Sequence, residues 1–216
     1  DISGPDGVPD GVIDDYDKTN IGSPMPKFTF GWTNTFRYKN FDLSVFINGS
    51  YGNKVYNYLS MKLTHMNSPW TNQLNAVNGR AQLVPINPNK VYEDGTMWYN
   101  DVSNVMVANP GASIPRATIN DPNDNDRISD RYIEDGSYIR LKNISLGYTF
   151  PKKTIDKLGL SNLRIYANIQ NLLTITGYDG YDPEIGASTS SVNVYGLDNG
   201  RYPSPTVYSF GLNVSF

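Results

Sequence analysis

Four aspartates near the start of the chain are spaced so that together they could bind a calcium ion. These are Asp6, Asp10, Asp14 and Asp17. They match ligand positions 1, 5, 9 and 12 of a Ca²⁺-binding loop, and Gly11 and the carbonyl of Val12 match positions 6 and 7. Val8 stands at position 3, where that motif has a carboxylate or an amide. The stretch predicts either a Ca²⁺-stabilised loop or a solvated turn rich in glycine and aspartate; we expect no required cofactor.

Residues that could cleave a bond are scarce in this chain. His65 is the only histidine, and no G-x-S-x-G nucleophile motif accompanies it, so a serine–histidine–aspartate triad is not indicated. The acidic run at 121–126 lacks the spacing and the glycine of a metal loop, while Glu134 and Asp135 stand in a turn before a strand. The sequence therefore favours a protein that is not an enzyme, and it contains no nucleic-acid-binding motif.

Aromatic loop residues and polar strand residues are the better candidates for contacting a ligand. Tryptophan and tyrosine rings can stack on sugars or anchor a protein interface, or they can pack a loop against itself. The aromatic candidates, all in one long connection, are Trp70, Tyr92, Trp98 and Tyr99. The polar candidates are Arg37 and Arg164, which share the polar strand faces with Asp42, Asn48, Asn168 and Gln170.

Five segments that carry or connect these residues alternate between apolar and polar positions, with the period of a β-strand. The last shows the pattern most clearly, because every second residue from Tyr208 to Phe216 is apolar. In the third segment the alternation shifts phase at Ile139 and Leu141, which predicts a β-bulge. The predicted strands cover about residues 27–38, 41–51, 138–150, 163–174 and 206–216.

The connections between these segments alternate in length. Residues 39–40 and 151–162 form short connections, and the second should contain a helical turn around Thr154–Leu158 that Gly159 ends. Residues 52–137 and 175–205 form long connections. Outer-membrane β-barrels have short periplasmic turns and long external loops. This parity places the short connections in the periplasm, and it places residues 1–26 and both long loops outside the cell.

The alternation alone fits two classes of protein, because a soluble β-sandwich and a membrane barrel share the same period. Aromatic residues cluster near the strand ends, as in barrel girdles, and strands of about ten residues can cross a bilayer at a tilt. The 16 tyrosines among 216 residues fit a β-rich surface or barrel protein, while the absence of cysteine excludes a disulfide scaffold and the net charge of −3 gives no argument for nucleic acid. Five strands cannot close a barrel and would leave edges unpaired in lipid. The predicted fold class is all-β, an antiparallel transmembrane barrel of which residues 27–216 form the C-terminal part.

Five sequence blocks follow one another along nearly the whole chain. They are GVIDDYD at 11–17, IGSPMPKF at 21–28, DRYIEDGSYIRLKNISLGYTFP at 130–151, LRIYANIQNLLT at 163–174 with GYDPE at 180–184, and PSPTVYSFGLNVSF at 203–216. In these blocks the chain resembles the SusC/RagA-type TonB-dependent transporters of Bacteroidetes. Each block alone is moderately specific, and together they are highly specific for that family.

The resemblance implies a 22-stranded outer-membrane barrel of which these are the last five strands. It also implies a plug in the lumen, a SusD-like surface lipoprotein as a lid, and energy from TonB–ExbBD acting through an N-terminal part outside this chain. Substrates of such importers are oligosaccharides or, in some members, oligopeptides. The alternatives are a passive outer-membrane porin or adhesin barrel and a soluble β-sandwich that binds glycans. An outer-membrane hydrolase is a more distant alternative.

Overall fold

The computed structural model describes residues 1–121, 123–185 and 195–216. The chain divides into two compact units. One, here called the loop unit, comprises Asp1–Asn20 and Tyr58–Tyr132, and the other, the sheet unit, comprises Ile21–Asn57 and Ile133–Phe216. Each unit is assembled from two separate stretches of sequence, so the fold depends on contacts between residues distant in the chain.

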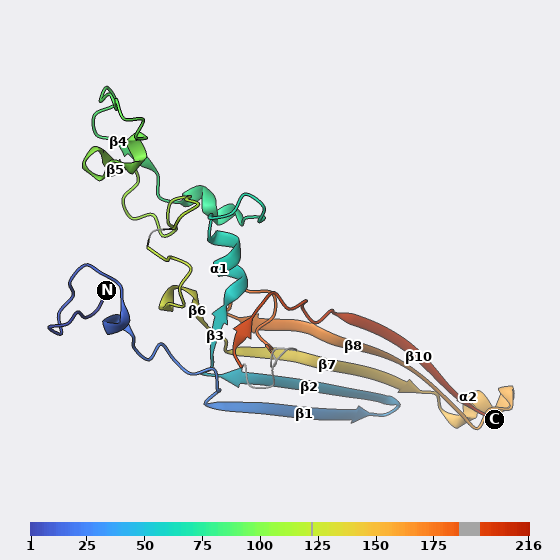
Figure 1. Cartoon of the computed structure of the whole chain (residues 1–216). Helices are drawn as coiled ribbons and strands as arrows, with labels where there is room; N and C mark the ends of the chain where they lie inside the picture. The colour runs from blue at the N-terminus through green and yellow to red at the C-terminus, as the bar shows by residue number, and fades with distance from the viewer. Residues whose placement is uncertain (122, 186–194) are drawn as a thin grey trace. The chain divides into compact units, whose positions relative to one another are not determined.

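A five-stranded antiparallel sheet dominates the sheet unit (Figure 1). Its order is β1-β2-β7-β8-β10. The strands are β1 (Phe28–Tyr38), β2 (Phe41–Tyr51), β7 (Tyr138–Thr149), β8 (Asn162–Thr176) and β10 (Val207–Ser215). The all-β, antiparallel character expected from the alternation is confirmed, and each strand lies within two residues of an expected segment at both ends.

The alternation places apolar and polar side chains on opposite faces of this sheet. One apolar row in register across the strands consists of Phe36, Leu43, Leu146, Ala167 and Phe210. Side chains on this apolar face remain in contact with solvent in the isolated chain. Phe36 is 55% exposed and Phe210 is 83% exposed. A soluble domain rarely leaves so large an apolar surface uncovered.

The predicted bulge is present in β7. The register of β7 shifts between Leu141 and Asn143 against β8, and the same strand shifts opposite Phe46/Ile47 of β2. The extra residue returns Ile139 and Leu141 to the apolar face, since they pair with Ile175 and Leu173. The phase shift in the sequence therefore records a bulge in an otherwise continuous apolar face.

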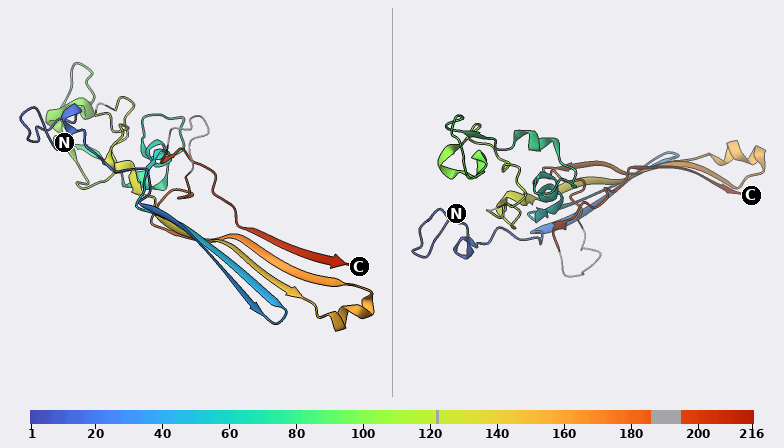
Figure 2. Two further views of the ribbon diagram at one scale, coloured as in Figure 1. Left: turned by 90° about the horizontal axis from the view of Figure 1, so that it is seen from below. Right: turned by 45° about the horizontal axis from the view of Figure 1, so that its top comes forward.

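The two short connections lie at one end of the sheet. Lys39 and Asn40 join β1 to β2 in a tight turn in which Lys39 has a φ of 53°. Between β7 and β8 the chain forms α2 (Lys152–Ile155) and η6 (Asp156–Leu158), and Gly159 ends the turn in the left-handed conformation. Figure 2 shows α2 and the C-terminus at this same end of the sheet. We call it the short-turn end.

A smaller sheet packs at the other end of the sheet unit. It has the order β6-β3-β9, formed by β6 (Ile133–Asp135), β3 (Lys54–Asn57) and β9 (Leu197–Asp198). β3 pairs antiparallel with β6 and parallel with β9. Val55 on β3 is 1% exposed and Tyr178 is 5% exposed. Part of the buried core of this unit thus lies where the long connections leave the strands, while Ile155 of α2, 2% exposed, is buried at the short-turn end.

The loop unit consists of short elements. They are η1 (Asp15–Asp17), α1 (Tyr58–Thr64), η2 (Asn75–Gly79), β4 (Leu83–Pro85), η3 (Trp98–Asn100), η4 (Val102–Asn104), β5 (Val105–Val107) and η5 (Asp130–Tyr132). β4 and β5 pair as an antiparallel ladder. In the described part of the chain, none of the helices has the length and apolar character needed to cross a membrane.

Candidate functional site

An ion pair bridges three strands on the polar face of the sheet near the short-turn end. Arg164 of β8 donates through Nε at 3.2 Å and through Nη2 at 2.6 Å to the two carboxylate oxygens of Asp42 on β2. β7 lies between these two strands. The guanidinium of Arg164 also stacks over the ring of Tyr166, 5.2 Å from its centroid. Two-pronged pairing of this kind holds both side chains in one orientation.

Gly147 of β7 makes room for this bridge. A Cβ atom at Gly147 would lie 2.2 Å from Nη2 of Arg164 and 2.6 Å from Oδ1 of Asp42. Those distances are far below van der Waals contact, so a side chain at this position would require the ends of the Arg164 and Asp42 side chains to move. The absence of a side chain at 147 therefore permits a contact between residues that are not on adjacent strands.

A hollow of about 560 Å³ opens beside the ion pair. Its walls are formed by Arg37, Lys39, Asn40, Phe41, Asp42, Thr149, Phe150 and Arg164. Arg37 lies directly across the strand pair from Asp42, but the carboxylate bonds to Arg164. We call this feature the basic hollow. It brings together both arginines that the sequence singled out as ligand candidates.

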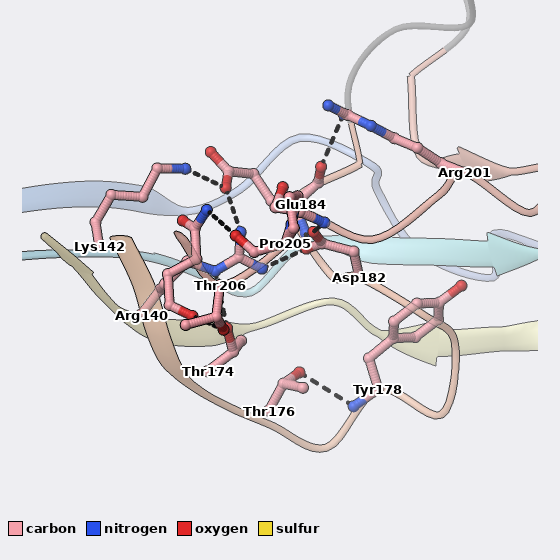
Figure 3. Close-up of polar contacts among 12 residues, drawn as sticks. Arg140, Lys142, Thr174, Thr176, Tyr178, Asp182, Glu184, Arg201, Pro205 and Thr206 are labelled. Carbon is pink, nitrogen blue, oxygen red and sulfur yellow. Dashed lines mark hydrogen bonds and ion pairs between the residues drawn. The ribbon is translucent and has the colours of Figure 1, made fainter. Parts of the chain in front are cut away.

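At the other end of the sheet a buried arginine holds a loop against the strands (Figure 3). Arg140 of β7 is 3% exposed. It donates to Asp182, to Glu184 at 2.7 Å and to the hydroxyl of Thr174 at 2.8 Å. Lys142 donates to the same carboxylate oxygen of Glu184 at 2.6 Å. We call this set, with two cations and two carboxylates, the loop clamp.

The buried carboxylate of Asp182 accepts hydrogen bonds from several donors. Besides Arg140 it accepts hydrogen bonds from the backbone amides of Glu184 at 2.9 Å and Ser204 at 3.0 Å. Burial alone would raise the pKa of Asp182, but the hydrogen bonds from Arg140 and the amides outweigh it and hold that pKa below its ordinary value. The clamp therefore joins the start and the end of the loop that connects β8 to β10.

A tyrosine and an aspartate are buried together in the same loop. The hydroxyl of Tyr178 donates to Asp198, which is 1% exposed and also accepts from the amides of Gly200 and Arg201. Burial, and then the hydrogen bond to Asp198, raises the pKa of the Tyr178 hydroxyl well above its usual range. These groups are buried and paired, so their chemistry is structural: they fix the loop and leave no free nucleophile.

The four candidate aromatic residues of the loop unit differ in exposure and in their contacts. Trp70 is 93% exposed, whereas the hydroxyl of Tyr92 is fixed by Asp101 at 2.8 Å and by Asn104 at 2.9 Å. The rings of Trp98 and Tyr99 pack edge to face with centroids 5.7 Å apart. Tyr92 therefore supports its own loop, and Trp70 is the aromatic side chain most available to a partner.

The four N-terminal aspartates are not gathered around a common point. Asp17 accepts hydrogen bonds from the amides of Ile2, Ser3 and Asp14, and the first two of these come at 2.5 and 3.1 Å. These bonds lower its pKa to about 2. The carboxylates of Asp10 and Asp14 likewise accept from nearby amides, at 2.9 and 2.8 Å. Within the described residues these aspartates do not form a group whose ligand atoms could share one ion, and the Ca²⁺-stabilised loop stays a prediction.

A different trio is the one that comes together in the described residues. His65, Asp121 and Asp126 have ligand atoms within 4.8 Å of one another. Nε2 of His65 lies 2.8 Å from Asp121, and Nδ1 lies 3.9 Å from Asp126. One carboxylate thus faces each ring nitrogen, which is the arrangement of a hydrogen-bonded histidine and not that of three ligands around one ion.

Sequence reasoning passed over Arg140, Asp182 and Glu184 as functional residues. The blocks at 130–151 and 180–184 contain all three, yet neither block shows by itself that they meet. One signal was present, because Arg140 is a charged residue between Ile139 and Leu141, where the phase shift was expected. A charged residue at that place needs a partner, and the loop after β8 supplies it.

Known proteins resemble this chain in sequence and in fold. No protein-family model matches the sequence. The chain is 36% identical over 211 residues to TonB-dependent receptor P3 of Formosa agariphila, covering 95% of this chain and 18% of that receptor. It is 29% identical over 209 residues to TonB-dependent receptor SusC of Bacteroides thetaiotaomicron, covering 95% and 17%. The chain thus spans about a fifth of the length of the curated relatives it matches.

Solved structures share the fold. The RagAB peptide importer in the open-open state superposes with a TM-score of 0.64 at 20% identity, covering 100% of this chain and 20% of that chain. The RagAB peptide transporter gives 0.63 at 19% identity, covering 90% and 18%. The antiparallel sheet therefore has the same fold as part of the RagAB transporter. The sequence matches show that the chain belongs to the TonB-dependent receptors.

Proposed function

We propose that this chain forms part of the wall of an outer-membrane importer that takes up oligosaccharides or oligopeptides. The observation that carries the proposal is the two-faced sheet. Each of the five strands has exposed aromatic or aliphatic side chains on one face, while the opposite face carries arginine, aspartate, asparagine and glutamine. A lipid-facing outer surface and a wet lumen require that division.

In this proposal the outer edges of β1 and β10 pair with further strands of the same barrel. Within the described residues these two strands each have one neighbour in the sheet, and an unpaired edge is costly in lipid. The resemblance implies 22 strands in all and a plug inside them. The short-turn end then faces the periplasm, while residues 1–26 and both long loops lie outside the cell.

Two observations support two different substrate classes. The structural neighbour RagAB is described as a peptide importer, whereas the resemblance to SusC-type receptors implies oligosaccharides for many members. A SusD-like lipoprotein would capture the ligand with the external loops, and TonB–ExbBD would drive its release inward. Relatives that are receptors and transporters support a function in binding and transport, without bond cleavage.

Energy dependence separates this proposal from its main rival, a passive porin or adhesin. We would express the full-length transporter with its lipoprotein and measure uptake of labelled oligosaccharides and oligopeptides with and without TonB. An importer should lose nearly all uptake without TonB while keeping surface binding. Uptake that is unchanged without TonB would instead establish a passive pore.

The exposed tryptophan offers a test of the candidate ligand surface. Trp70→Ala should weaken ligand binding by the full-length complex about two- to twelvefold, since one stacked ring contributes about 0.5–1.5 kcal/mol. Tyr92→Phe should leave binding unchanged, because that hydroxyl bonds to Asp101 and Asn104. Equilibrium binding of a fluorescent ligand measures both. Equal weakening by both variants would assign Trp70 a structural role only.

A further inference from the structure

We infer that the basic hollow binds a carboxylate group of the oligomer that the importer takes up. The inference rests on the proposed importer, in which the polar face of the sheet lines a wet lumen. It deepens that proposal, because it names the charge that the substrate should carry. The face on which the hollow opens, its surplus of positive charge and one arginine without an ionic partner carry the argument.

The charged side chains of the hollow belong to the polar face of the sheet. Arg37 and Asp42 are partners in register, and Asp42 is also the partner of Gly147 on β7. Thr149 lies two residues beyond Gly147 and pairs with Arg164 of β8. Side chains two residues apart on a strand share a face. These groups therefore face the lumen of the proposed barrel, where a dissolved substrate passes and a lipid headgroup does not.

The hollow has a surplus of positive charge. Its lining contains three cations, Arg37, Lys39 and Arg164, and one carboxylate, that of Asp42. Arg164 and Asp42 neutralise each other, because Nη2 of the arginine lies 2.6 Å from the carboxylate. Nζ of Lys39 lies 5.3 Å from the ring centroid of Tyr38, which belongs to the apolar face, so this charge lies at the edge of the hollow. Arg37 remains as the cation inside it.

Arg37 has no ionic partner in the described residues. Asp42 lies across from it in register but accepts hydrogen bonds from Arg164 through both carboxylate oxygens. Arg37 is exposed, so its planar guanidinium is free to donate two parallel hydrogen bonds, which is the geometry that a carboxylate matches. Asn40 and Thr149 line the same hollow, and their side chains can add neutral donors.

The size of the hollow and the row of residues beside it fit a carboxylate that is carried on a longer molecule. A volume of about 560 Å³ lies within the usual range for small-molecule sites and exceeds what a carboxylate group alone needs. Hydroxyl and amide groups of the adjacent row can bind the hydroxyls of a sugar or the amides of a peptide, whereas the hollow selects for negative charge. That uncharged row crosses all five strands and consists of Thr35, Ser44, Ser145, Asn168 and Ser209.

Binding of paired oligomers to the full-length transporter with its lipoprotein tests the site. The probes are a neutral oligoglucoside with the corresponding oligoglucuronide, and a glutamine peptide with the corresponding glutamate peptide. In at least one pair the carboxylated member should bind about two- to fivefold more tightly, as expected of an exposed charge pair, and added salt should reduce this preference. The pair that shows the preference distinguishes an acidic sugar from an acidic peptide.

Substitutions at the short-turn end assign the preference to the hollow. Arg37→Gln should abolish it, and Arg37→Lys should keep part of it, because the charge stays while the paired donors are lost. The control Lys157→Gln removes the same charge from η6 at the same end, outside the hollow, and should leave the preference unchanged. Equal weakening of both members of a pair by Arg37→Gln would assign Arg37 a structural role and overturn the inference.

The reactivity of Arg37 separates a substrate from a carboxylate of the protein itself. Phenylglyoxal, which modifies exposed arginines, should label Arg37 in the free transporter, and the carboxylated oligomer should slow this labelling. An Arg37 that is unreactive without ligand would show that another part of the protein fills the hollow, and the site would be overturned. The absence of any preference for carboxylated probes, with TonB-dependent uptake intact, would overturn the site and leave the importer. Uptake that persists without TonB would contradict the importer itself.

Discussion

Single residues decide which charges meet on the polar face of the sheet. Asp42 has Arg37 opposite it on the neighbouring strand, yet it bonds to Arg164 two strands away. The missing side chain at Gly147 makes that choice sterically possible. The long side chain of Arg164 extends across β7, and its guanidinium donates two hydrogen bonds to Asp42. Strand register alone would have paired Asp42 with Arg37.

Gly147→Ala should therefore break the pair between Asp42 and Arg164. The added methyl group would lower the free energy of unfolding of the full-length transporter by about 0.2–1 kcal/mol, because it displaces a partly exposed ion pair. Urea unfolding in detergent measures this. Gly177→Ala is the matched control, because a Cβ at Gly177 meets no atom within 4 Å and its φ is not positive. Similar stability of the two variants would contradict a role for the open space at 147.

At the scale of elements, the strands are held by their ladders and the loop after β8 is held by charges. Arg140 extends from β7 to two carboxylates that lie 42 and 44 residues further along the chain. Because the arginine is buried, its partners cannot be replaced by water without a large penalty. The clamp makes the described parts of the β8–β10 connection an ordered extension of the polar face.

Arg140→Met should release this loop. It leaves Asp182 and Glu184 without their buried partner, at a cost of about 3–5 kcal/mol. We expect faster proteolytic cleavage between residues 177 and 206 of the full-length protein. The comparison is Lys54→Met, which breaks the exposed pair with Asp135 at 3.5 Å and should change cleavage little. If both variants are cut at the same rate, the buried clamp does not order the loop.

At the scale of the whole molecule, one face of the sheet must be covered by something apolar. Phe210 is 83% exposed and lies in the middle of β10, while Ser209 beside it points to the polar face. A bilayer around the assembled barrel would cover the apolar face without help from another protein domain. The same two-sided division makes the polar face suitable for a wet lumen.

Two neighbouring substitutions test that assignment. Phe210→Arg should lower the stability of the assembled transporter by about 1–3 kcal/mol, because it places a charge on the face that contacts lipid, between the bilayer midplane and the interface. Ser209→Arg, one residue away on the opposite face, should be tolerated. The amount of full-length protein recovered in the outer membrane, and its unfolding in lipid bilayers, measure the difference. Equal effects of both variants would favour a soluble sandwich over a membrane barrel.

The extent of the strands and the side to which each residue points could be predicted from the sequence, because both depend on a period of two that is local to each strand. Even the bulge in β7 left a trace, as a phase shift at Ile139 and Leu141. The two short turns and their common end followed from the same counting. The resemblance to SusC-type receptors, which the comparisons confirm, also depended on blocks that are continuous in sequence.

What the tertiary structure decided is which polar groups meet. The four N-terminal aspartates have the spacing of a metal loop, but Asp10, Asp14 and Asp17 accept hydrogen bonds from backbone amides instead. Arg140 bonds to carboxylates in a loop more than forty residues further along the chain. Arg164 bonds to Asp42 across β7, where Gly147 leaves room between them. Alternation is set by the geometry of one strand, whereas these pairings depend on which strands and loops become neighbours. That choice is made by the assembled sheet, so spacing along the chain could not reveal it.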